Sequence, residues 1–441
     1  MTGTPSPGTI STKQARIAEL AKQMPEAALR SLSHHMDKEW LQEAYRRTRK
    51  DGAVGVDGQT SEQFAEELEA NLETLLNRAK SGTYRAPPVR RVTIPKGKGK
   101  SRPIGIPTFE DKVLQRAVVM LLEPIYEQDF YEFSYGFRPG KSAHDAVWEL
   151  DRVLRRMGGG WVLDVDIQSF FDTLDRAKLR ELLGQRVADG VVVRLVGKWL
   201  HAGVLDGEIL SHSDTGTPQG GVLSPLLANI YLHEALDRWW VEQVQPRLET
   251  GAHLVRYVDD LVIVTRTRRD AERVQAVLPQ RFAKYGLTLH PEKTRLLRFW
   301  RPPRKGKGPG SFDFLGFTFY WGRSRKGNRV LKQKTMKSRL TRAITAVDQW
   351  LRRVRHLPVK KQVQTLRRKL RGHYNYYGIR NNSKAIGNFL HAVTRRWKYW
   401  LGHRSQRARM TWEKFNRLLR RYPLPPARLP RRRRQQRLAN L

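Results

Sequence analysis

The sequence contains no cysteine. Disulfides, thiol nucleophiles, iron–sulfur clusters and cysteine-ligated zinc modules are therefore excluded within these 441 residues. Because such a composition is typical of intracellular proteins, we expect a cytoplasmic location. No run approaches the roughly 20 apolar residues that cross a bilayer, and residues 1–12 lack the charged and then apolar pattern of a signal peptide. We expect a soluble chain with a short disordered start over residues 1–12.

Acidic residues are scarce in the last third of the chain. Lys and Arg number 83 against 42 acids, which gives a formal charge of +41. Residues 301–441 hold 40 of these cations and only three acids, Asp313, Asp348 and Glu413. They therefore carry +37, whereas residues 1–300 carry +4. So large an excess of one sign favours a polyanionic partner, nucleic acid first and an acidic membrane second.

Hydrophobic periodicity predicts mixed secondary structure in the first 300 residues. Helices are expected over 14–50, over 61–76 and over 111–126, and strands 89–96 and 102–106 flank a glycine-lysine turn that is typical of a hairpin. The centre then alternates strand and helix patterns, which favours an α/β or α+β domain. The segments are 161–167, 174–183, 190–200, 223–240, 254–265 and 270–285.

The C-terminal third has a different pattern. Helical spacing of apolar residues predicts three successive amphipathic helices, at 340–354, 359–374 and 386–401, with arginine-rich outer faces. The tail contains the run Arg431-Arg432-Arg433-Arg434, which we expect to be disordered until it meets phosphate.

Two adjacent acids, Asp259 and Asp260, stand between strongly apolar β-type runs. Aspartate is depleted in buried strands. A hairpin turn is one interpretation, because aspartate is a common turn residue. A functional site is the other.

A third carboxylate favours the functional interpretation. Asp166 lies near the end of the mostly apolar run 161–167, just before Phe170-Phe171-Asp172. Three carboxylates that converge at strand ends are costly unless divalent cations neutralise them, and ligands that are all oxygen suit Mg²⁺, with Mn²⁺ as a substitute. Two such ions, about 3.5–4 Å apart, would activate a primer 3′ hydroxyl and stabilise a departing pyrophosphate.

Five motifs follow one another across about residues 90–319. They are Arg102-Pro103-Ile104-Gly105-Ile106-Pro107, Tyr135-Gly136-Phe137-Arg138-Pro139, Asp166-Ile167 with Phe170-Phe171-Asp172, Pro218-Gln219-Gly220-Gly221-Val222-Leu223-Ser224-Pro225, and Tyr257-Val258-Asp259-Asp260. Together they resemble the reverse transcriptase/maturase proteins encoded by bacterial group II introns, and the last motif is similar to the family's Tyr-x-Asp-Asp box. Val258 stands where that family most often has alanine.

The resemblance implies a right-hand polymerase in which Asp166, Asp259 and Asp260 are the catalytic carboxylates of the palm. Asp166, Asp259 and the backbone carbonyl of Ile167 would be the main metal ligands, with Asp260 beside them. Phe171 would lie under the incoming sugar, where a ribose 2′ hydroxyl would collide, which implies deoxynucleotide substrates. A core aromatic is the alternative interpretation of Phe171.

Further residues are implied in the nucleotide pocket. Gln219 would border it, and Lys293 would assist the pyrophosphate. Lys96 and Arg102 flank the glycine-lysine turn, so a hairpin would bring both cations to one end, where an arginine fork and a lysine point charge suit a triphosphate. The alternative is a solvated basic loop, which fits Lys98 and Lys100 better.

The C-terminal third also matches the family. Phe314-Leu315-Gly316-Phe317-Thr318-Phe319 resembles the hairpin that grips the primer at the end of the palm, and the helices after it correspond to the thumb. Arg371-Gly372-His373-Tyr374-Asn375-Tyr376-Tyr377 is similar to a motif of maturase thumbs. Arg371, Tyr376 and Tyr377 are therefore candidate RNA contacts, the tyrosines by stacking on bases. Packing in the helix core is the alternative, and it is the one we expect for Tyr374.

The expected architecture is an α+β right-hand polymerase followed by an all-helical thumb. The domains are a start at 1–12, an N-terminal extension at 13–60, fingers and palm at 61–320, a thumb/maturase (X) domain at 321–425 and a basic tail at 426–441. No nuclease domain built on cysteine pairs is expected in this sequence.

The expected function is RNA-directed DNA synthesis together with binding of intron RNA to assist splicing and retrohoming. The expected partners are an RNA template, a DNA primer, structured intron RNA and deoxynucleoside triphosphates, with no membrane, in a bacterial cytoplasm. Two alternatives remain open: a domesticated reverse transcriptase acting in DNA repair or CRISPR spacer acquisition, and a non-catalytic RNA-binding splicing factor.

Overall fold

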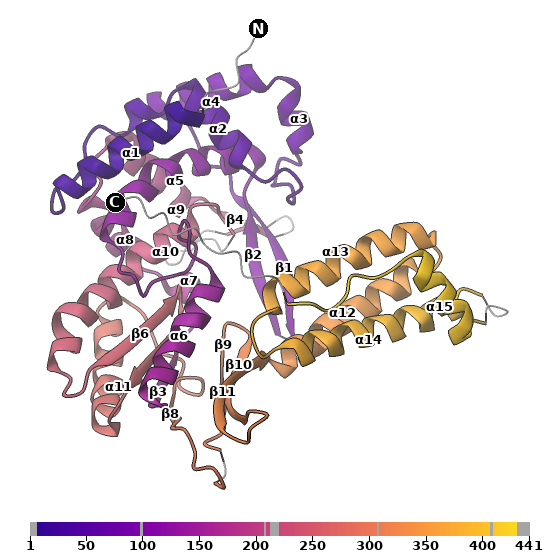
Figure 1. Cartoon of the computed structure of the whole chain (residues 1–441). Helices are drawn as coiled ribbons and strands as arrows, with labels where there is room; N and C mark the ends of the chain where they lie inside the picture. The colour runs from indigo at the N-terminus through magenta and orange to yellow at the C-terminus, as the bar shows by residue number, and fades with distance from the viewer. Residues whose placement is uncertain are drawn as a thin grey trace. The chain divides into compact units, whose positions relative to one another are not determined.

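The computed structural model describes residues 7–97, 100–206, 209–211, 220–306, 308–405 and 409–429. The chain divides into two compact units. The first contains residues 1–146 and 161–297, and the second contains residues 147–160 and 298–441. Both combine helices with β-sheet (Figure 1), which agrees with the predicted α+β class.

Helices dominate the start of the first unit. Helix α5 (Phe109–Asp129) is apolar along most of its length, and α1 (Pro7–Gln23) and α2 (Lys38–Arg47) pack against it (Figure 1). Trp40 of α2 is fully buried and donates its indole N–H to the Ala117 carbonyl at 3.0 Å. The helix predicted over 14–50 is therefore interrupted, with a short 3₁₀ turn, η1 (Ser33–His35), before α2. Residues 7–12, which we expected in a disordered start, belong to α1.

The helix expected from residue 61 is two helices, α3 (Ser61–Glu66) and α4 (Leu68–Ser81). Thr60 caps α3, because its hydroxyl accepts the Gln63 N–H while the Gln63 side chain accepts the Thr60 N–H. The chain then forms the predicted hairpin, in which β1 (Val89–Gly97) pairs with β2 (Lys100–Ile106). Strands β4 (Val204–Asp206) and β5 (Ile209–Ser211) extend this sheet in the order β2-β1-β4-β5.

A second sheet forms the centre of the first unit. Its order is β6 (Ala252–Tyr257), β7 (Asp260–Thr265), β3 (Trp161–Asp166) and β8 (Arg295–Arg298). Strand β7 is antiparallel to both of its neighbours, β6 and β3. Helix α11 (Arg268–Ala283) contacts β3 and β7.

The remaining helices of this unit connect the two sheets. They are α7 (Phe170–Thr173), α8 (Arg176–Gly184), α9 (Gly190–His201) and α10 (Ser224–Leu232). Beyond α10 the helix widens into two π-helical segments, η2 (His233–Arg238) and η3 (Trp240–Val244), and ends in a 3₁₀ turn, η4 (Gln245–Arg247). Helix α6 (Ala143–Met157) precedes β3 in the chain, and from Val147 onward it belongs to the second unit.

Besides residues 147–160, the second unit contains a three-stranded antiparallel sheet in the order β11 (Arg329–Thr335), β10 (Phe317–Arg323) and β9 (Ser311–Phe314). The division of the chain after residue 297 assigns this sheet to the second unit. Aromatic packing explains that assignment. Phe299 contacts Phe312 with ring centroids 4.9 Å apart, and its carbonyl accepts the Trp321 indole N–H at 3.2 Å.

The three predicted C-terminal helices are confirmed as α12 (Lys337–Val354), α13 (Val359–Tyr377) and α14 (Ser383–Gly402). They lie side by side (Figure 1), and a fourth helix, α15 (Trp412–Arg421), packs Phe415 against Trp397. Their apolar faces form one core. Its most buried members include Leu351, Leu366, Leu370, Ile386 and Trp397.

Candidate active site

The three predicted carboxylates lie together at one end of the central sheet. Asp166, the last residue of β3, pairs in register with Asp260, the first residue of β7. Tyr257 pairs with Asp260 across the β6–β7 hairpin, so Val258 and Asp259 form a two-residue turn. The hairpin-turn interpretation of the Asp259-Asp260 pair is therefore confirmed. The turn lies beside Asp166, which is the arrangement that the functional interpretation requires.

The turn has an unusual backbone. Val258 has φ of 56° and is buried. A β-branched residue in this left-handed region is an outlier that costs on the order of 1–3 kcal/mol and persists only where its surroundings enforce it. One such enforcing contact is the backbone of Gly136, where an added Cβ would lie 2.5 Å from Val258 Cγ2. The Tyr135-Gly136-Phe137-Arg138-Pro139 motif thus packs against the Tyr257-Val258-Asp259-Asp260 motif.

Cations on the chain after α11 face the carboxylates of β3. Lys293 Nζ contacts Asp166 Oδ1 at 2.8 Å, and Arg295 Nη2 contacts Asp164 Oδ2 at 3.1 Å. The Asp166 carbonyl accepts the His290 N–H at 2.8 Å. Lys293, predicted to assist the pyrophosphate, thus pairs with a predicted metal ligand, where its charge reduces the repulsion among the carboxylates.

The donors at this end of the sheet are carboxylate oxygens, which is the chemistry that Mg²⁺ prefers. Asp166 is one-third exposed, so the cluster is open to solvent ions. Within the described part of the chain, no three His, Cys, Asp or Glu side chains are already arranged as a metal-binding group. The donor set fits Mg²⁺ in chemical type.

Ile167 and Phe171 lie next to Asp166 in the chain. Ile167 is buried and forms an isolated bridge with Leu289. Phe171 is half-buried, packs against the core and contacts Phe170 edge-on, with ring centroids 5.2 Å apart. One face of Phe171 is therefore in the core while part of the ring is accessible, which is compatible with both interpretations of this residue.

A second group of predicted residues surrounds the start of α10. Gly220 has φ of 117°, and a Cβ there would lie 2.5 Å from the Gly105 carbonyl oxygen. The Arg102-to-Pro107 motif and the Pro218-to-Pro225 motif therefore meet, as a shared nucleotide pocket requires. Arg102 is exposed on β2, opposite Ile94 of β1. Gln219 and the side chain of Lys96 lie outside the described residues.

Sequence analysis missed the residues that support this loop. Gln115 of α5 accepts the Val222 N–H at 2.8 Å and the Leu223 N–H at 3.3 Å, and donates to Asp111 at 3.2 Å. Asp111 also accepts from the Tyr84 hydroxyl and, at 2.5 Å, from the Trp199 indole. Burial raises the pKa of Asp111 to about 6, while these hydrogen bonds act in the opposite direction. No signal in the sequence singles out this pair, because Lys112 and Arg116 repeat the same spacing of polar residues in α5.

Phe137 is a further residue that sequence analysis did not single out. It is 61% exposed and its φ is 55°, both unusual for a large aromatic residue. Its ring lies 6.1 Å from that of Tyr257, next to the Val258-Asp259 turn. An exposed aromatic at this place is suited to stacking on a base.

The predicted RNA contacts belong to α13 in the second unit. Arg371 is exposed, and Tyr374 is buried as expected. Tyr376 is 39% exposed, but its ring stacks on Phe317 and its hydroxyl donates to the Leu315 carbonyl at 3.0 Å. Tyr377 is half-buried and contacts Phe317 edge-on. Both tyrosines therefore hold the 315–316 turn between β9 and β10, a packing role that sequence analysis gave as the alternative.

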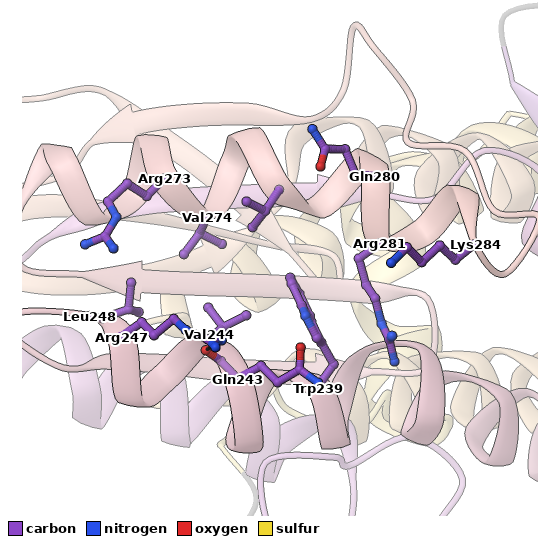
Figure 2. Close-up of a pocket in the computed structure, with 11 residues that line it drawn as sticks. Trp239, Gln243, Val244, Arg247, Leu248, Arg273, Val274, Gln280, Arg281 and Lys284 are labelled. Atoms are coloured by element: carbon purple, nitrogen blue, oxygen red, sulfur yellow. Dashed lines mark hydrogen bonds between the residues drawn. The ribbon is translucent and has the colours of Figure 1, made fainter.

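A cavity of about 270 Å³ lies between α11 and the helical segment 239–248 (Figure 2). Four cationic side chains and Trp239 contribute to its wall, and none of the described site residues lines it. The cations are Arg247, Arg273, Arg281 and Lys284. Arg281 is already engaged, because it donates to the Ala235 carbonyl at 2.9 Å and to the Glu234 carbonyl at 2.7 Å.

No helix in the described ranges has the length and apolarity that crossing a bilayer requires.

Comparison with known proteins agrees with the arrangement of these motifs. Residues 94–319, about half of the chain, match the family described as reverse transcriptase (RNA-dependent DNA polymerase). Protein YkfC of Escherichia coli is 34% identical over 355 residues, covering 72% of this chain and 90% of YkfC. The group II intron-encoded protein LtrA of Lactococcus lactis is 43% identical over 187 residues, covering 42% of this chain and 30% of LtrA. The mitochondrial nuclear intron maturase 2 of Arabidopsis thaliana is 29% identical over 179 residues, covering 31% of this chain and 24% of the maturase.

The chain therefore belongs to the reverse transcriptase family, among the group II intron-encoded reverse transcriptases and maturases.

Proposed function

We propose that the chain is an RNA-directed DNA polymerase that joins deoxynucleoside triphosphates to a primer with the help of two Mg²⁺ ions. One observation carries the proposal. Asp166 and Asp260 face each other in register at the end of β3 and β7, and Asp259 lies in the adjoining turn. Three carboxylates at one strand end are costly without cations, so their placement favours a metal-dependent site.

Asp166, Asp259, Asp260 and the Ile167 carbonyl would hold the ions, which when bound supply positive charge for the attacking 3′ hydroxyl and the leaving pyrophosphate. Lys293 beside Asp166 would keep the carboxylates in place before nucleotide binding. The accessible part of Phe171 would exclude a ribose 2′ hydroxyl.

The triphosphate would be bound by residues of the hairpin and of the loop before α10. Lys96 and Arg102 would contact its phosphates, and Gln219 would border the base and sugar. The close approach of Gly220 to Gly105 supports this assignment, because it brings the two motifs within reach of one ligand.

We propose binding of structured intron RNA, in support of splicing and retrohoming, as a second function. The charge of +37 on residues 301–441 supports it, since a charge of that size suits a phosphate backbone. The names of LtrA and of the Arabidopsis maturase support it as well. Arg371 and the exposed part of Tyr376 are the better candidates for RNA contact, and Tyr377 is the weaker one because it is half-buried.

In this proposal residues 61–320 act as fingers and palm and residues 321–425 as the thumb/maturase domain. The extension at 13–60 supports the fingers, and the tail at 426–441 adds phosphate contacts.

The experiment is extension of a DNA primer on an RNA template by the wild type and by the Asp259→Ala/Asp260→Ala double variant. We expect the double variant to lose Mg²⁺-dependent synthesis and to keep template affinity within a few fold, because carboxylates bind metal whereas basic side chains bind RNA. Measurable extension by the double variant would refute the assigned site.

A parallel splicing assay separates the alternatives. A wild type that promotes splicing of an intron RNA but never extends a primer would be the non-catalytic splicing factor. A wild type that extends primers with no preference for any intron RNA would be the domesticated polymerase.

A further inference from the structure

A buried arginine lies directly behind the catalytic turn. Arg256 is the residue before Tyr257 in β6, and its exposed fraction is 0%. Neighbouring positions of this strand, such as Val255, are apolar and buried. An arginine in such a strand is costly unless its N–H groups are all satisfied, so its partners indicate what it does.

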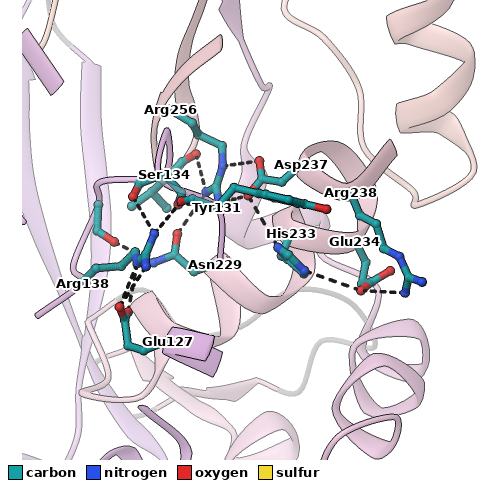
Figure 3. A network of polar contacts seen from close by, with 12 residues as sticks. Glu127, Tyr131, Ser134, Arg138, Asn229, His233, Glu234, Asp237, Arg238 and Arg256 are labelled. Carbon is teal, nitrogen blue, oxygen red and sulfur yellow. Dashed lines mark hydrogen bonds and ion pairs between the residues drawn. The ribbon is translucent and has the colours of Figure 1, made fainter. Parts of the chain in front are cut away.

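The Arg256 guanidinium joins three other elements (Figure 3). Its Nε donates to Asp237 Oδ1 at 2.8 Å, and its Nη2 donates to the other oxygen of the same carboxylate. Nη2 also donates to Ser134 Oγ at 2.7 Å, and Nη1 donates to Asn229 Oδ1 at 3.0 Å. The remaining contact runs from Nη1 to the Val258 carbonyl oxygen at 3.3 Å.

The contact with Val258 links this network to the active site. Val258 is the strained residue of the turn that contains Asp259, and a strained conformation needs surrounding contacts that enforce it. Arg256 binds the carbonyl of Val258 from one side. Asn229 donates to the Gly136 carbonyl at 2.6 Å, and Gly136 packs against the Val258 side chain from the other side.

The same network aligns the loop that carries Gly136. The Tyr135 N–H donates to the Arg256 carbonyl at 2.9 Å, and the Arg256 N–H donates to the Phe133 carbonyl at 2.9 Å. Arg138 donates to the Ser134 carbonyl at 3.0 Å and pairs with Glu127. Loop 133–138 is therefore bonded to β6 on the residue next to the catalytic turn.

The helix beyond α10 is shaped to deliver both partners of Arg256. Asn229 and Asp237 are eight residues apart, which in a regular α-helix would place them about 80° apart around the axis. The helix becomes π-helical at His233. A wider turn advances fewer degrees per residue, so it rotates Asp237 back toward the face of Asn229. Such π segments are frequent at functional sites.

The charge balance of the network depends on Arg256. His233 lies 4.0 Å from Asp237, but burial and the positive charge of Arg256 lower the pKa of His233 to about 3, so its imidazole is neutral at neutral pH. The Asp237 carboxylate is therefore balanced at close range by the guanidinium. A buried pair of this kind contributes little net stability compared with apolar residues, but removing one partner leaves the other charge buried and unpaired. The pair therefore fixes the position of the guanidinium beside the turn.

We propose that Arg256, with Asp237 and Asn229, is a positioning group that sets the conformation of the Val258-Asp259 turn and so the placement of Asp259 and Asp260. The inference rests on the proposed polymerase function for its kinetic consequence. The structural consequence, a turn held by the guanidinium, is independent of that function.

The test compares Arg256→Lys and Asn229→Ala with Arg186→Lys as a matched control. Arg186 also forms a buried ion pair in the first unit, with Asp129, and it donates to the Met24 and Ala27 carbonyls far along the chain from the turn. Lysine keeps the charge at either site but cannot form the arginine fork. Asn229→Ala removes two contacts without leaving a buried charge, and so covers the case in which Arg256→Lys does not fold.

We expect both network variants to lower kcat about a hundredfold, as small misplacements of catalytic groups do. We also expect the Mg²⁺ concentration for half-maximal activity to rise several fold while the Kd for primer–template stays unchanged. Arg186→Lys should lower the thermal midpoint but leave kcat and the Mg²⁺ response within a few fold of the wild type. The proposal would be overturned if Arg256→Lys and Asn229→Ala fold and keep the wild-type kcat. It would also be overturned if all three variants lose kcat in proportion to their loss of stability.

Amide hydrogen exchange of the peptide that covers residues 255–262 completes the test. It should be faster in both network variants than in Arg186→Lys at matched stability. If the wild type itself does not extend a primer, the proposed function fails while this measurement still decides on the positioning role. Unchanged exchange in the network variants would then refute it.

Discussion

At the Val258-Asp259 turn the contact between Gly136 and Val258 leaves no room for a side chain at residue 136. A Cβ at residue 136 would lie 2.5 Å from Val258 Cγ2 and 2.7 Å from the Val258 nitrogen. We expect Gly136→Ala to displace the turn and lower kcat by about tenfold or more. Gly197→Ala is the control, because an added Cβ there meets nothing within 4 Å apart from the backbone of its own helix, α9, and alanine favours a helix. Primer extension and thermal unfolding of both variants check this, and an active Gly136→Ala would show that the turn tolerates displacement.

A second prediction at the residue scale concerns Phe171 and the choice between ribonucleotides and deoxynucleotides. Because its ring is only partly in the core, we expect Phe171→Ala to fold and to incorporate ribonucleotides at least about tenfold more efficiently relative to deoxynucleotides. Phe171→Tyr keeps the ring and should keep the discrimination. The ratio of kcat/KM for the two nucleotide classes measures both variants. Unchanged discrimination in a folded Phe171→Ala would make Phe171 a core residue alone.

Residues of the site differ in how far the sequence predicted them. The convergence of Asp166, Asp259 and Asp260 at one end of the sheet was predictable, because acids in apolar strands are rare enough to be noticed. Arg256 lies within such a strand too. Its partners Asn229 and Asp237 come from a helix that changes from α-helical to π-helical turns, and no pattern in the sequence predicts that change. Gln115 was hidden because its partners are backbone N–H groups of a loop more than 100 residues away.

At the scale of elements, a buried histidine of α13 lies in the contact between α13 and α14. His373 is buried, stacks on Phe389 with ring centroids 3.8 Å apart, and has an Nε2 without a hydrogen-bond partner among the described residues. Burial lowers its pKa from 6.5 to about 4. The unfolded chain therefore takes up a proton first as the pH falls, so stability that is present above about pH 6.5 is lost toward pH 4.

We expect acidification from pH 7.5 to pH 5 to lower the free energy of unfolding of the second unit in the full-length wild type by up to about 2 kcal/mol. Its thermal midpoint should fall accordingly. His373→Gln, which cannot titrate, should lose less over the same range. The exposed His391 of α14 is the control, and His391→Gln should behave as the wild type does. A His373→Gln variant with the wild-type pH dependence would contradict the assignment.

Helices with strong periodicity were predictable as elements. Apolar spacing located α12, α13 and α14, and the glycine-lysine turn located the β1–β2 hairpin. The interruption between α1 and α2 has two signals that the expected helix over 14–50 overlooked. Pro25 follows the end of α1, and Asp37 caps α2 by accepting the Trp40 N–H at 2.9 Å. The grouping of β9, β10 and β11 with the second unit depends on aromatic contacts of Phe299, which spacing along the chain does not reveal.

At the scale of the whole molecule, the asymmetry of charge dominates. Residues 301–441 carry +37, so affinity for RNA should fall steeply with salt. We expect replacement of four exposed cations of the second unit by glutamine to reduce the log–log slope by up to about 3, at roughly 0.7 for each phosphate that is no longer neutralised. These are Arg352, Arg353, Lys360 and Lys361.

The control replaces four exposed cations of the first unit, Lys22, Arg30, Lys80 and Arg180. Filter binding over a salt series should show a smaller change of slope for this control. Equal changes in both variants would mean that RNA binds across both units.

The central claim is that the carboxylates at the end of β3 and β7 carry templated DNA synthesis, and strand β3 itself offers a matched pair to test it. Asp166 lies beside the turn and pairs with Lys293, while Asp164 lies one pleat earlier on the same face and pairs with Arg295. The decisive measurement is the rate of single-nucleotide addition on a primed RNA template with Mg²⁺, for Asp166→Asn and Asp164→Asn at matched stability. The account predicts a loss of about a thousandfold or more for Asp166→Asn and a change within a few fold for Asp164→Asn. Comparable rates for the two variants would contradict it.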